Sequence, residues 1–203
     1  LNVVSYSLIK SMSREKVKMD DNFTGIKIVT VGRLSREKGQ VIAIKVMARL
    51  KRDGYKDRWY LVGDGRDRKL YESMAAQYGL NGDCILVGAT PNPYPYMAKA
   101  DIYVQPSRHE GYCLTLSEAK CLGKPIITTD FAGAREQITD GYNGFIVKCS
   151  EDELYEKVRY LIDNPAERKR LSGNLEKATA DAADGLRKFE DCISDADFLR
   201  TRT

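Results

Sequence analysis

Three positively charged side chains, Arg33, Arg36 and Lys38, lie in a glycine turn that could bind an anion. Gly32 opens this turn, Arg33 follows it directly, and Lys38 comes just before a stretch with helical periodicity. Backbone N–H groups at the start of a helix and fixed positive charge beside them both favour a phosphate group. The turn therefore predicts a phosphate cradle, although a solvated loop in which Ser35 caps the helix explains the same residues equally well.

A second loop places carboxylates beside another helix start. Glu110 lies just before a helix expected to begin near residue 112 or 113, and Glu118 lies about a turn and a half inside that helix. The amides of residues 112–115 would face a ligand at the end of the sheet, and the Glu110 oxygens would accept hydrogen bonds from hydroxyl groups. A nucleotide sugar carries both phosphate and hydroxyls, so it fits these groups.

Simpler structural interpretations of the same loop stay open. Ser107 with Glu110, and Thr115 with Glu118, each match the spacing of a helix capping box. His109 is most simply a loop histidine near an anion site rather than a catalytic base. The paired carboxylates could also suggest glycoside hydrolysis, but that chemistry places them across a scissile bond, and a Rossmann sheet is a poor host for it.

A third glycine turn begins like a dinucleotide-binding fingerprint. Gly63 and Gly65 have the right spacing, but Arg68 stands at the third glycine position. The pattern also follows the second β-rich run of the chain, whereas the fingerprint belongs after the first. A tight turn between strand and helix is therefore favoured over binding of NAD or FAD.

The elements that must position these loops alternate between strands and helices. Short apolar runs predict strands that are buried on both faces, and the amphipathic patterns between them, clearest at 39–53, predict helices. This alternation predicts an α/β fold with a Rossmann-like, doubly wound, six-stranded parallel sheet, whose ligand residues follow the strands. Charged stretches at 151–163 and 166–183 predict C-terminal helices. The expected strands are 26–31, 59–62, 84–87, 102–104, 125–129 and 144–147.

Composition excludes several classes of protein. The 203 residues are 42% hydrophobic and 31% charged, as in soluble globular proteins, and no apolar run approaches the length of a membrane-spanning helix. The net charge of +4 is not gathered into basic runs, so no nucleic-acid partner is expected. Five scattered cysteines predict reduced thiols in a cytoplasmic protein, with Cys113 and Cys121 packing from one helix face. A single histidine leaves no histidine-based metal site.

Together these stretches resemble the C-terminal half of the retaining GT-B glycosyltransferases of family 4, also called glycosyl transferases group 1. The resemblance covers VGRLSREKG (31–39), LVGDG (61–65), PSRHEGYCLTLSEAKCLGKPIITTD (106–130) and DGYNGFIV (140–147). The pair formed by Glu110 and Glu118 matches the E-x7-E hallmark of that family. Cys113 departs from the glycine or proline of many relatives, and Ala132-Gly133 departs from their Gly-Gly.

The resemblance implies a role for each matching residue. Arg33 and Lys38 would hold the donor diphosphate and stabilise the departing nucleotide, and Glu110 would contact the hydroxyls of the donor sugar. Glu118 would bind the ribose hydroxyls. The resemblance thus implies the catalytic residues Arg33, Lys38 and Glu110, and no metal ligand. The donor-binding residues that it implies are Gly32, Arg33, Lys38, Gly88 in the base-contacting turn, Glu110, Gly111, Tyr112, Cys113, Leu114, Thr115 and Glu118.

The resemblance also implies how the chain is organised and what it works with. Residues 1–24 would be the remnant of an interdomain connection, 25–165 the nucleotide-sugar-binding domain, and 166–203 C-terminal helices and a tail. The acceptor-binding N-terminal Rossmann domain is missing, so the chain alone is expected to be inactive.

The expected partners are a nucleotide sugar, that N-terminal domain, and an acceptor sugar or glycolipid. The donor is expected to be a UDP-sugar first and a GDP-sugar second, with no cofactor required. The protein is expected in the cytoplasm, including the inner face of the membrane, which it would reach only through the missing domain. A non-catalytic nucleotide-binding module and a GT-B epimerase or phosphorylase-like enzyme remain the alternatives.

Overall fold

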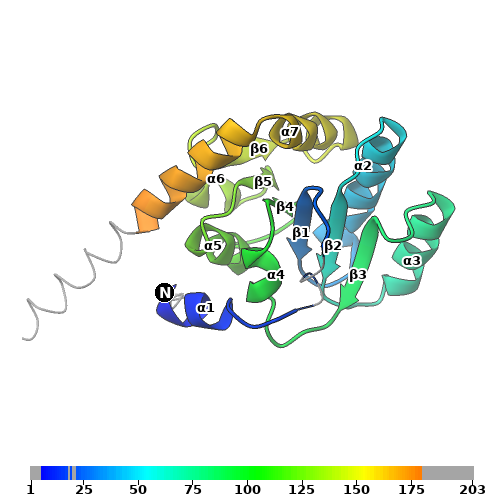
Figure 1. Ribbon diagram of the computed structural model, residues 1–203, viewed down its shortest axis with the longest axis horizontal. Helices are drawn as coiled ribbons and strands as arrows, with labels where there is room; N and C mark the ends of the chain where they lie inside the picture. The colour runs from blue at the N-terminus through cyan, green and yellow to red at the C-terminus, as the bar shows by residue number, and fades with distance from the viewer. Residues whose placement is uncertain (1–5, 18, 20–21, 180–203) are drawn as a thin grey trace, which may run out of the picture.

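The computed structural model describes residues 6–17, 19 and 22–179, and a parallel sheet runs through its middle (Figure 1). The strands are β1 (Lys27–Val31), β2 (Arg58–Val62), β3 (Cys84–Gly88), β4 (Ile102–Gln105), β5 (Ile126–Thr129) and β6 (Phe145–Val147). Their order is β3-β2-β1-β4-β5-β6, and every neighbouring pair is parallel. The predicted six-stranded, doubly wound sheet is therefore confirmed, with each predicted strand end within one residue of the observed end.

Helices lie on both sides of this sheet (Figure 1). They are α1 (Tyr6–Met12), α2 (Gln40–Arg52), α3 (Arg68–Gln77), α4 (Tyr94–Ala98), α5 (Leu114–Cys121), α6 (Ala134–Gln137) and α7 (Glu151–Asp163), and residues 165–179 are helical too. The helices α2, α3 and α7 pack in one core cluster, and α4, α5 and α6 pack in the other. None of the described helices is both long and apolar enough to cross a membrane.

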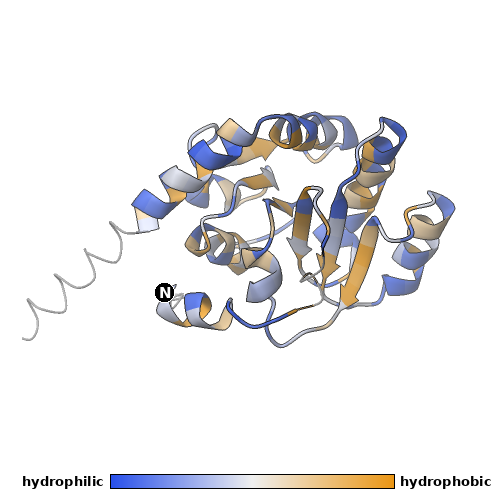
Figure 2. Cartoon of the chain, viewed as in Figure 1, coloured by the Kyte–Doolittle hydropathy of each residue, from blue (hydrophilic) through white to orange (hydrophobic). Residues whose placement is uncertain are grey.

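The strands are apolar on both faces because helices cover both faces. Every residue of β4 and β5 is buried, and hydropathy colouring shows mostly hydrophobic strands between helices with polar outer surfaces (Figure 2). Neighbouring strand residues point to opposite sides, so that Ile28 joins the core cluster with α2 and Val29 joins the cluster with α4. Continuous apolar runs without polar alternation are what such a sheet requires.

Two helices begin differently from the sequence-based expectation. Ser35 precedes a single 3-10 turn (Arg36–Lys38) and its side chain makes no capping hydrogen bond, and α2 then starts at Gln40. The helix α5 starts at Leu114 rather than near 112 or 113, because Cys113 has a left-handed backbone with φ 56° that cannot belong to a right-handed helix.

The predicted C-terminal helices are present as far as the structure describes the chain. The helix α7 matches the predicted range 151–163, and its Ser150 side chain accepts a hydrogen bond from the Glu153 N–H (3.3 Å). The second predicted helix, 166–183, is observed from 165 to 179. Its last residues, the tail up to residue 203 and the first residues of the predicted connection 1–24 lie outside the described residues.

Gly63 and Gly65, in the turn after β2, allow this turn to pack closely against the loop after β1. A Cβ atom added to Gly63 would lie 2.1 Å from the Gly32 carbonyl oxygen, and one added to Gly65 would lie 2.4 Å from that of Leu34. The Leu34 N–H also donates to the Asp64 carbonyl (3.0 Å). This close contact between the loops after β1 and β2 supports the interpretation as a tight turn.

The crossover between β1 and β4 marks the ligand-binding end of the sheet. These two strands are neighbours, yet the chain leaves β1 toward β2 and leaves β4 toward β5. The carboxyl ends of β1 and β4 therefore mark the point where the strand order reverses, and doubly wound sheets bind their ligands at such a point. Both predicted ligand loops follow these two strands.

Candidate active site

The loops after β1 and β4 touch each other at the crossover. The Arg108 N–H donates to the Glu37 carbonyl, with an N···O distance of 2.7 Å. Gly39 has φ +71°, and a Cβ atom there would lie 1.9 Å from the Pro106 carbonyl oxygen. A glycine is required where two backbones approach this closely. The two predicted ligand loops therefore form one continuous surface.

An ion pair joins predicted residues from the two loops. Lys38 Nζ donates to Glu110 Oε1, and the side chains are only 23% and 12% exposed, respectively. The aliphatic part of Lys38 passes over Gly32, since a Cβ atom there would lie 3.5 Å from Lys38 Cδ. The pair presents a fixed ammonium group beside a carboxylate, which suits a ligand with both phosphate and hydroxyl groups.

Polar side chains from the end of β4 and the loop after it lie behind Glu110, and sequence reasoning missed one of them, Gln105. Ser107 Oγ donates to Glu110 Oε1 (2.9 Å), and Thr115 Oγ1 donates to Gln105 Oε1 (3.2 Å). Neither capping box forms, because no helix begins after Ser107 and Thr115 lies inside α5 rather than before it. The S-x-x-E spacing did connect Ser107 with Glu110, but nothing in the sequence singled out Gln105.

Backbone donors gather at the start of α5. Cys113 is the one non-glycine residue with a positive φ in the described part of the chain, and the Gln137 side chain holds this turn by donating to the Tyr112 carbonyl. The N–H groups of residues 111–115 have no acceptor among the described residues. Consecutive donors at a helix N-terminus are suited to an anion.

The two cysteines expected on one face of this helix have different positions. Cys121 belongs to α5, but Cys113 precedes it at the N-cap, so the prediction of a shared helix face is wrong. Both side chains are buried, as expected of packing residues. Burial raises the pKa of the Cys113 thiol, and it raises the pKa of Cys121 to about 11.

Glu118 has a different environment from Glu110. The Tyr94 hydroxyl donates to Glu118 Oε1 with a distance of 3.1 Å. Burial raises the pKa of the Glu118 carboxyl, and the hydrogen bond from Tyr94 opposes that effect by stabilising the charged form. Tyr94 begins α4, after β3, and no sequence motif connected it with Glu118.

The remaining predicted residues surround this centre less closely. Arg33 is exposed, and its guanidinium group makes no hydrogen bond or ion pair with the described residues. Gly88 ends β3, two strands away from β1, and accepts a hydrogen bond from the Gly63 N–H (2.9 Å). Tyr112 and Leu114 are 48% and 44% exposed. The structure thus joins Lys38 to Glu110 directly, whereas Arg33, Tyr112 and Leu114 are exposed and Gly88 is buried at the end of β3.

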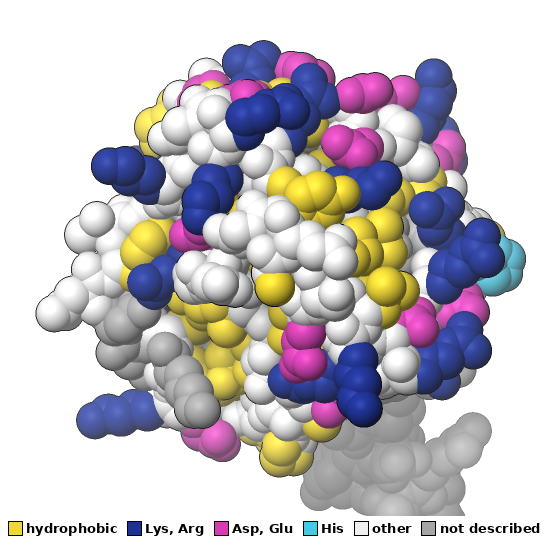
Figure 3. Space-filling view, turned by 90° about the vertical axis from the view of Figure 1, so that its right-hand side faces the viewer, with side chains coloured by type: hydrophobic (Ala, Val, Ile, Leu, Met, Phe, Trp, Pro, Cys, Tyr) yellow, Lys and Arg dark blue, Asp and Glu magenta, His cyan; other side chains and the backbone are white. Residues whose placement is uncertain are grey.

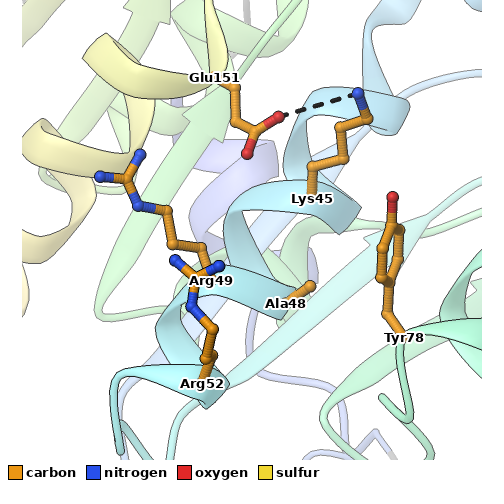
Figure 4. A pocket seen from close by; sticks show the side chains of 6 residues that line it. All are labelled: Lys45, Ala48, Arg49, Arg52, Tyr78 and Glu151. Atoms are coloured by element: carbon orange, nitrogen blue, oxygen red, sulfur yellow. Dashed lines mark ion pairs between the residues drawn. The ribbon is translucent and has the colours of Figure 1, made fainter.

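A hollow of about 270 Å³ lies between α2, the end of α3 and the start of α7 (Figure 4). It is lined by Lys45, Ala48, Arg49, Arg52, Tyr78 and Glu151. Its cations already have acidic partners, since Lys45 pairs with Glu151 (3.8 Å) and Arg49 with Asp152 (2.7 Å). Basic and acidic side chains are also interspersed over the face of the molecule seen in Figure 3. The hollow therefore offers an anion little uncompensated charge.

Comparison with known proteins identifies a family. The model of the family described as Glycosyl transferases group 1 matches residues 12–178. A Campylobacter jejuni N-acetylgalactosamine-N,N'-diacetylbacillosaminyl-diphospho-undecaprenol 4-alpha-N-acetylgalactosaminyltransferase is 27% identical over 95% of this chain and 51% of its own length. The alpha-D-kanosaminyltransferase of Streptomyces kanamyceticus is 29% identical over 79% of this chain and 42% of its own length. The chain thus spans about half the length of these curated relatives.

Solved structures share the fold. The Anabaena protein HepE, in complex with UDP and glucose, superposes with a TM-score of 0.74 at 21% identity, over 94% of this chain and 53% of its own. The C-terminal domain of a group 1 family glycosyl transferase from Francisella tularensis gives a TM-score of 0.68 at 27% identity, over 77% of this chain and 86% of its own. The Rossmann-like sheet is that of the C-terminal half of a GT-B protein. With the family match over most of its length, the chain belongs to the glycosyl transferases group 1.

Proposed function

We propose that this chain is the donor-binding domain of a retaining glycosyltransferase. The reaction transfers a sugar from a nucleotide-diphosphate sugar to an acceptor during the synthesis of a polysaccharide, a lipopolysaccharide or another glycoconjugate. One observation carries the proposal. Lys38 and Glu110 meet from two separate loops at the crossover of the sheet, beside the backbone donors of residues 111–115.

The charges of the site fit the departure of a nucleotide diphosphate. Negative charge develops on the diphosphate as its bond to the sugar breaks, and positive groups already in place stabilise it. The ion pair with Glu110 holds the Lys38 ammonium group in place, and the aliphatic part of Lys38 packs over Gly32. Arg33 is exposed and can approach the phosphates that Lys38 would bind. We propose that these cations serve where other transferases use a divalent ion, so that no metal cofactor is required.

Glu110 and Glu118 bind different parts of the donor. Glu110 accepts hydrogen bonds from the hydroxyls of the transferred sugar, next to the cation that holds the diphosphate. Glu118 accepts those of the ribose. The base lies at the turn that follows Gly88, the last residue of β3. Thr90, Asn92 and Tyr96, after this strand, line part of a hollow of about 600 Å³. A hollow of this size is ordinary for a small-molecule ligand.

UDP is the favoured nucleotide, and GDP is the second choice. The structural neighbour HepE was solved with UDP, which supports this preference. In the whole protein, a separate N-terminal Rossmann domain would bind the acceptor sugar or glycolipid and close over the donor. This chain alone would then bind nucleotide but transfer little or no sugar. We place the enzyme in the cytoplasm, including the inner membrane face where lipid-linked acceptors lie.

Calorimetric titration of the purified chain with UDP, GDP and ADP in EDTA tests the proposal. UDP is expected to bind without metal, and addition of Mg²⁺ is expected to change its affinity little. Joint substitution of Arg33→Ala and Lys38→Ala is expected to weaken UDP by at least about a hundredfold, because each charge-assisted contact contributes roughly 1.5–3 kcal/mol.

A matched control removes the same charge elsewhere. Lys45→Ala with Arg52→Ala, in the hollow of Figure 4, is expected to leave UDP affinity within about twofold. Equal effects of the two double variants would show that overall charge, not this site, attracts the nucleotide. Glu118→Ala is expected to weaken UDP and UDP-sugar alike, whereas Glu110→Ala weakens mainly the UDP-sugar, and the reverse pattern would exchange their roles.

A further inference from the structure

A chain of buried polar side chains connects the end of β4 with the Glu110 carboxylate. The Tyr103 hydroxyl donates to Gln105 Oε1 (2.7 Å), and Gln105 Nε2 donates to Ser107 Oγ (2.8 Å). Ser107 Oγ in turn donates to Glu110 Oε1 (2.9 Å). Tyr103 and Gln105 are completely buried, and Ser107 is 1% exposed. Because these side chains are buried, a polar group that loses its partner is left unsatisfied, at a cost in stability.

The chemistry of the amide sets the direction of every proton in this chain. The Gln105 nitrogen can only donate, so Ser107 must accept from it and turn its own proton toward Glu110. The Gln105 oxygen accepts from two hydroxyl groups, those of Tyr103 and Thr115. Each member is therefore satisfied in one arrangement, and in that arrangement Glu110 receives a hydrogen bond as a carboxylate.

Neighbouring strands hold the backbone on which this chain depends. Thr129, at the end of β5, donates through its hydroxyl to the Ser107 carbonyl and to the Gln105 carbonyl, and the latter distance is 3.3 Å. Both threonine and serine are buried. Ser107 thus has little freedom to turn away from Glu110.

The consequence for Glu110 is that its two oxygens differ. Oε1 accepts from both Ser107 and Lys38, whereas Oε2 has no partner among the described residues. Two donors on one oxygen, from opposite loops, fix the plane and direction of the carboxylate. Oε2 is then the acceptor that remains for a ligand at the crossover.

We propose that Gln105 and Ser107 are positioning residues that orient Glu110, so that Oε2 accepts a hydrogen bond from a hydroxyl of the transferred sugar. This rests on the proposed function, in which Glu110 contacts that sugar. Preorganisation of the acceptor strengthens binding of the sugar-bearing donor and does not affect UDP, which lacks the hydroxyl. These hydrogen-bonded side chains thus increase the selectivity of the site for the UDP-sugar over UDP.

The test compares the dissociation constants of UDP and of a UDP-sugar for each variant. The sugar is the one among UDP-glucose, UDP-galactose and UDP-N-acetylglucosamine that the unchanged chain binds most tightly. Ser107→Ala is expected to weaken the UDP-sugar by about tenfold and UDP by less than about twofold. Gln105→Met, which keeps the size but removes both hydrogen-bonding groups, is expected to act in the same direction and serves if the serine variant does not fold.

A double-mutant cycle and a control separate positioning from a general loss of stability. In a Glu110→Ala background, Ser107→Ala is expected to have no further effect on the UDP-sugar, since the group it orients is gone. Thr30→Val removes another buried hydroxyl, which donates to the Val104 carbonyl (2.7 Å), and is expected to leave the ratio of the two affinities unchanged.

Two outcomes distinguish failure of this inference from failure of the proposed function. If Glu110→Ala changes the ratio while Ser107→Ala and Gln105→Met leave it unchanged, the positioning role is wrong and the role of Glu110 stands. If Glu110→Ala itself leaves the ratio unchanged, or no UDP-sugar binds, the assignment of Glu110 fails, and the positioning role fails with it.

Discussion

At the scale of single residues, Glu110 and Glu118, the two glutamates of the E-x7-E motif, lie in different environments. Glu110 has a cation and a hydroxyl on one oxygen, so its charge is compensated within the chain. Among the described residues, Glu118 has only the Tyr94 hydroxyl as a hydrogen-bond partner, and burial raises the pKa of its carboxyl. A carboxylate that is costly to ionise gains from hydroxyl donors, which a ribose would supply.

This difference predicts a pH dependence that Tyr94 controls. If Glu118 accepts ribose hydroxyls as a carboxylate, UDP affinity falls as the pH drops through its raised pKa, that is, at a higher pH than for an ordinary glutamate. Tyr94→Phe removes a hydrogen bond that lowers this pKa, so the loss of affinity is expected to begin at a still higher pH. Calorimetric titrations with UDP at a series of pH values give the midpoint pH of this loss of affinity.

Tyr78→Phe is a suitable control, because Tyr78 is 46% exposed at the end of α3 and does not contact Glu118 in the described residues. Its pH profile should coincide with that of the unchanged chain. An unchanged midpoint in Tyr94→Phe would mean that Glu118 does not titrate in the nucleotide complex.

At the scale of elements, the site depends on how closely the loops after β1 and β4 approach. Gly39 has a positive φ and lies against the Pro106 carbonyl. Lys38 precedes Gly39, and Glu110 lies in the loop that Pro106 begins, so this contact sets the distance between the two charged residues. The helix α2 starts immediately afterwards at Gln40, and Gln40 Nε2 donates to the Arg33 carbonyl (2.9 Å).

Gly39→Ala is therefore expected to damage both stability and binding. Gly79 offers a matched comparison, since its φ is +67° against +71° for Gly39 but a Cβ atom there would meet nothing within 4 Å. Gly79→Ala should cost about 1 kcal/mol of unfolding free energy from backbone strain alone. Gly39→Ala should cost at least about 2 kcal/mol more, because the loops must also separate.

Denaturant unfolding measures the two free energies, and calorimetry measures UDP affinity. The Gly79 variant is expected to bind UDP normally and the Gly39 variant to lose most of its affinity. Equal destabilisation of the two variants would show that the loops after β1 and β4 can separate without a loss of stability.

At the scale of the whole molecule, the helix at 165–179 connects the two faces of the sheet. Leu171 belongs to the core cluster with α2 and α7, whereas Leu175 belongs to the cluster with α4 and α5. Both are almost completely buried. The Arg168 guanidinium also donates to the Ile162 carbonyl near the end of α7 (2.8 Å). This segment is thus part of the folded unit.

Leu175→Ala is expected to lower the free energy of unfolding by about 2–5 kcal/mol, as for other buried leucines. Leu70→Ala, on the outer surface of α3 with 54% exposure, should change it by less than about 0.5 kcal/mol. Thermal or denaturant unfolding of both variants provides the comparison. A small effect at Leu175 would mean that this helix does not contribute to the core.

The sequence by itself determined the elements and their layering. Buried strands in a doubly wound sheet require continuous apolar runs separated by amphipathic helices, and these local patterns are visible in residues such as Ile26–Val31 and Gln40–Arg52. It also predicted which loops carry the candidate ligand residues, because the carboxyl ends of parallel strands share one edge. Lys38, Glu110 and Glu118 could be named from their charged side chains and from the family motifs that they match.

Only the tertiary structure decided which side chains are partners. Thr115 has the spacing of a capping residue for Glu118, yet its hydroxyl donates to Gln105 Oε1, and Gln105 Nε2 donates to Ser107 Oγ. The contact between Tyr94 and Glu118 joins residues 24 positions apart. Such pairings depend on strand order, loop approach and the need to satisfy every buried polar group at once, and a local pattern contains none of that information.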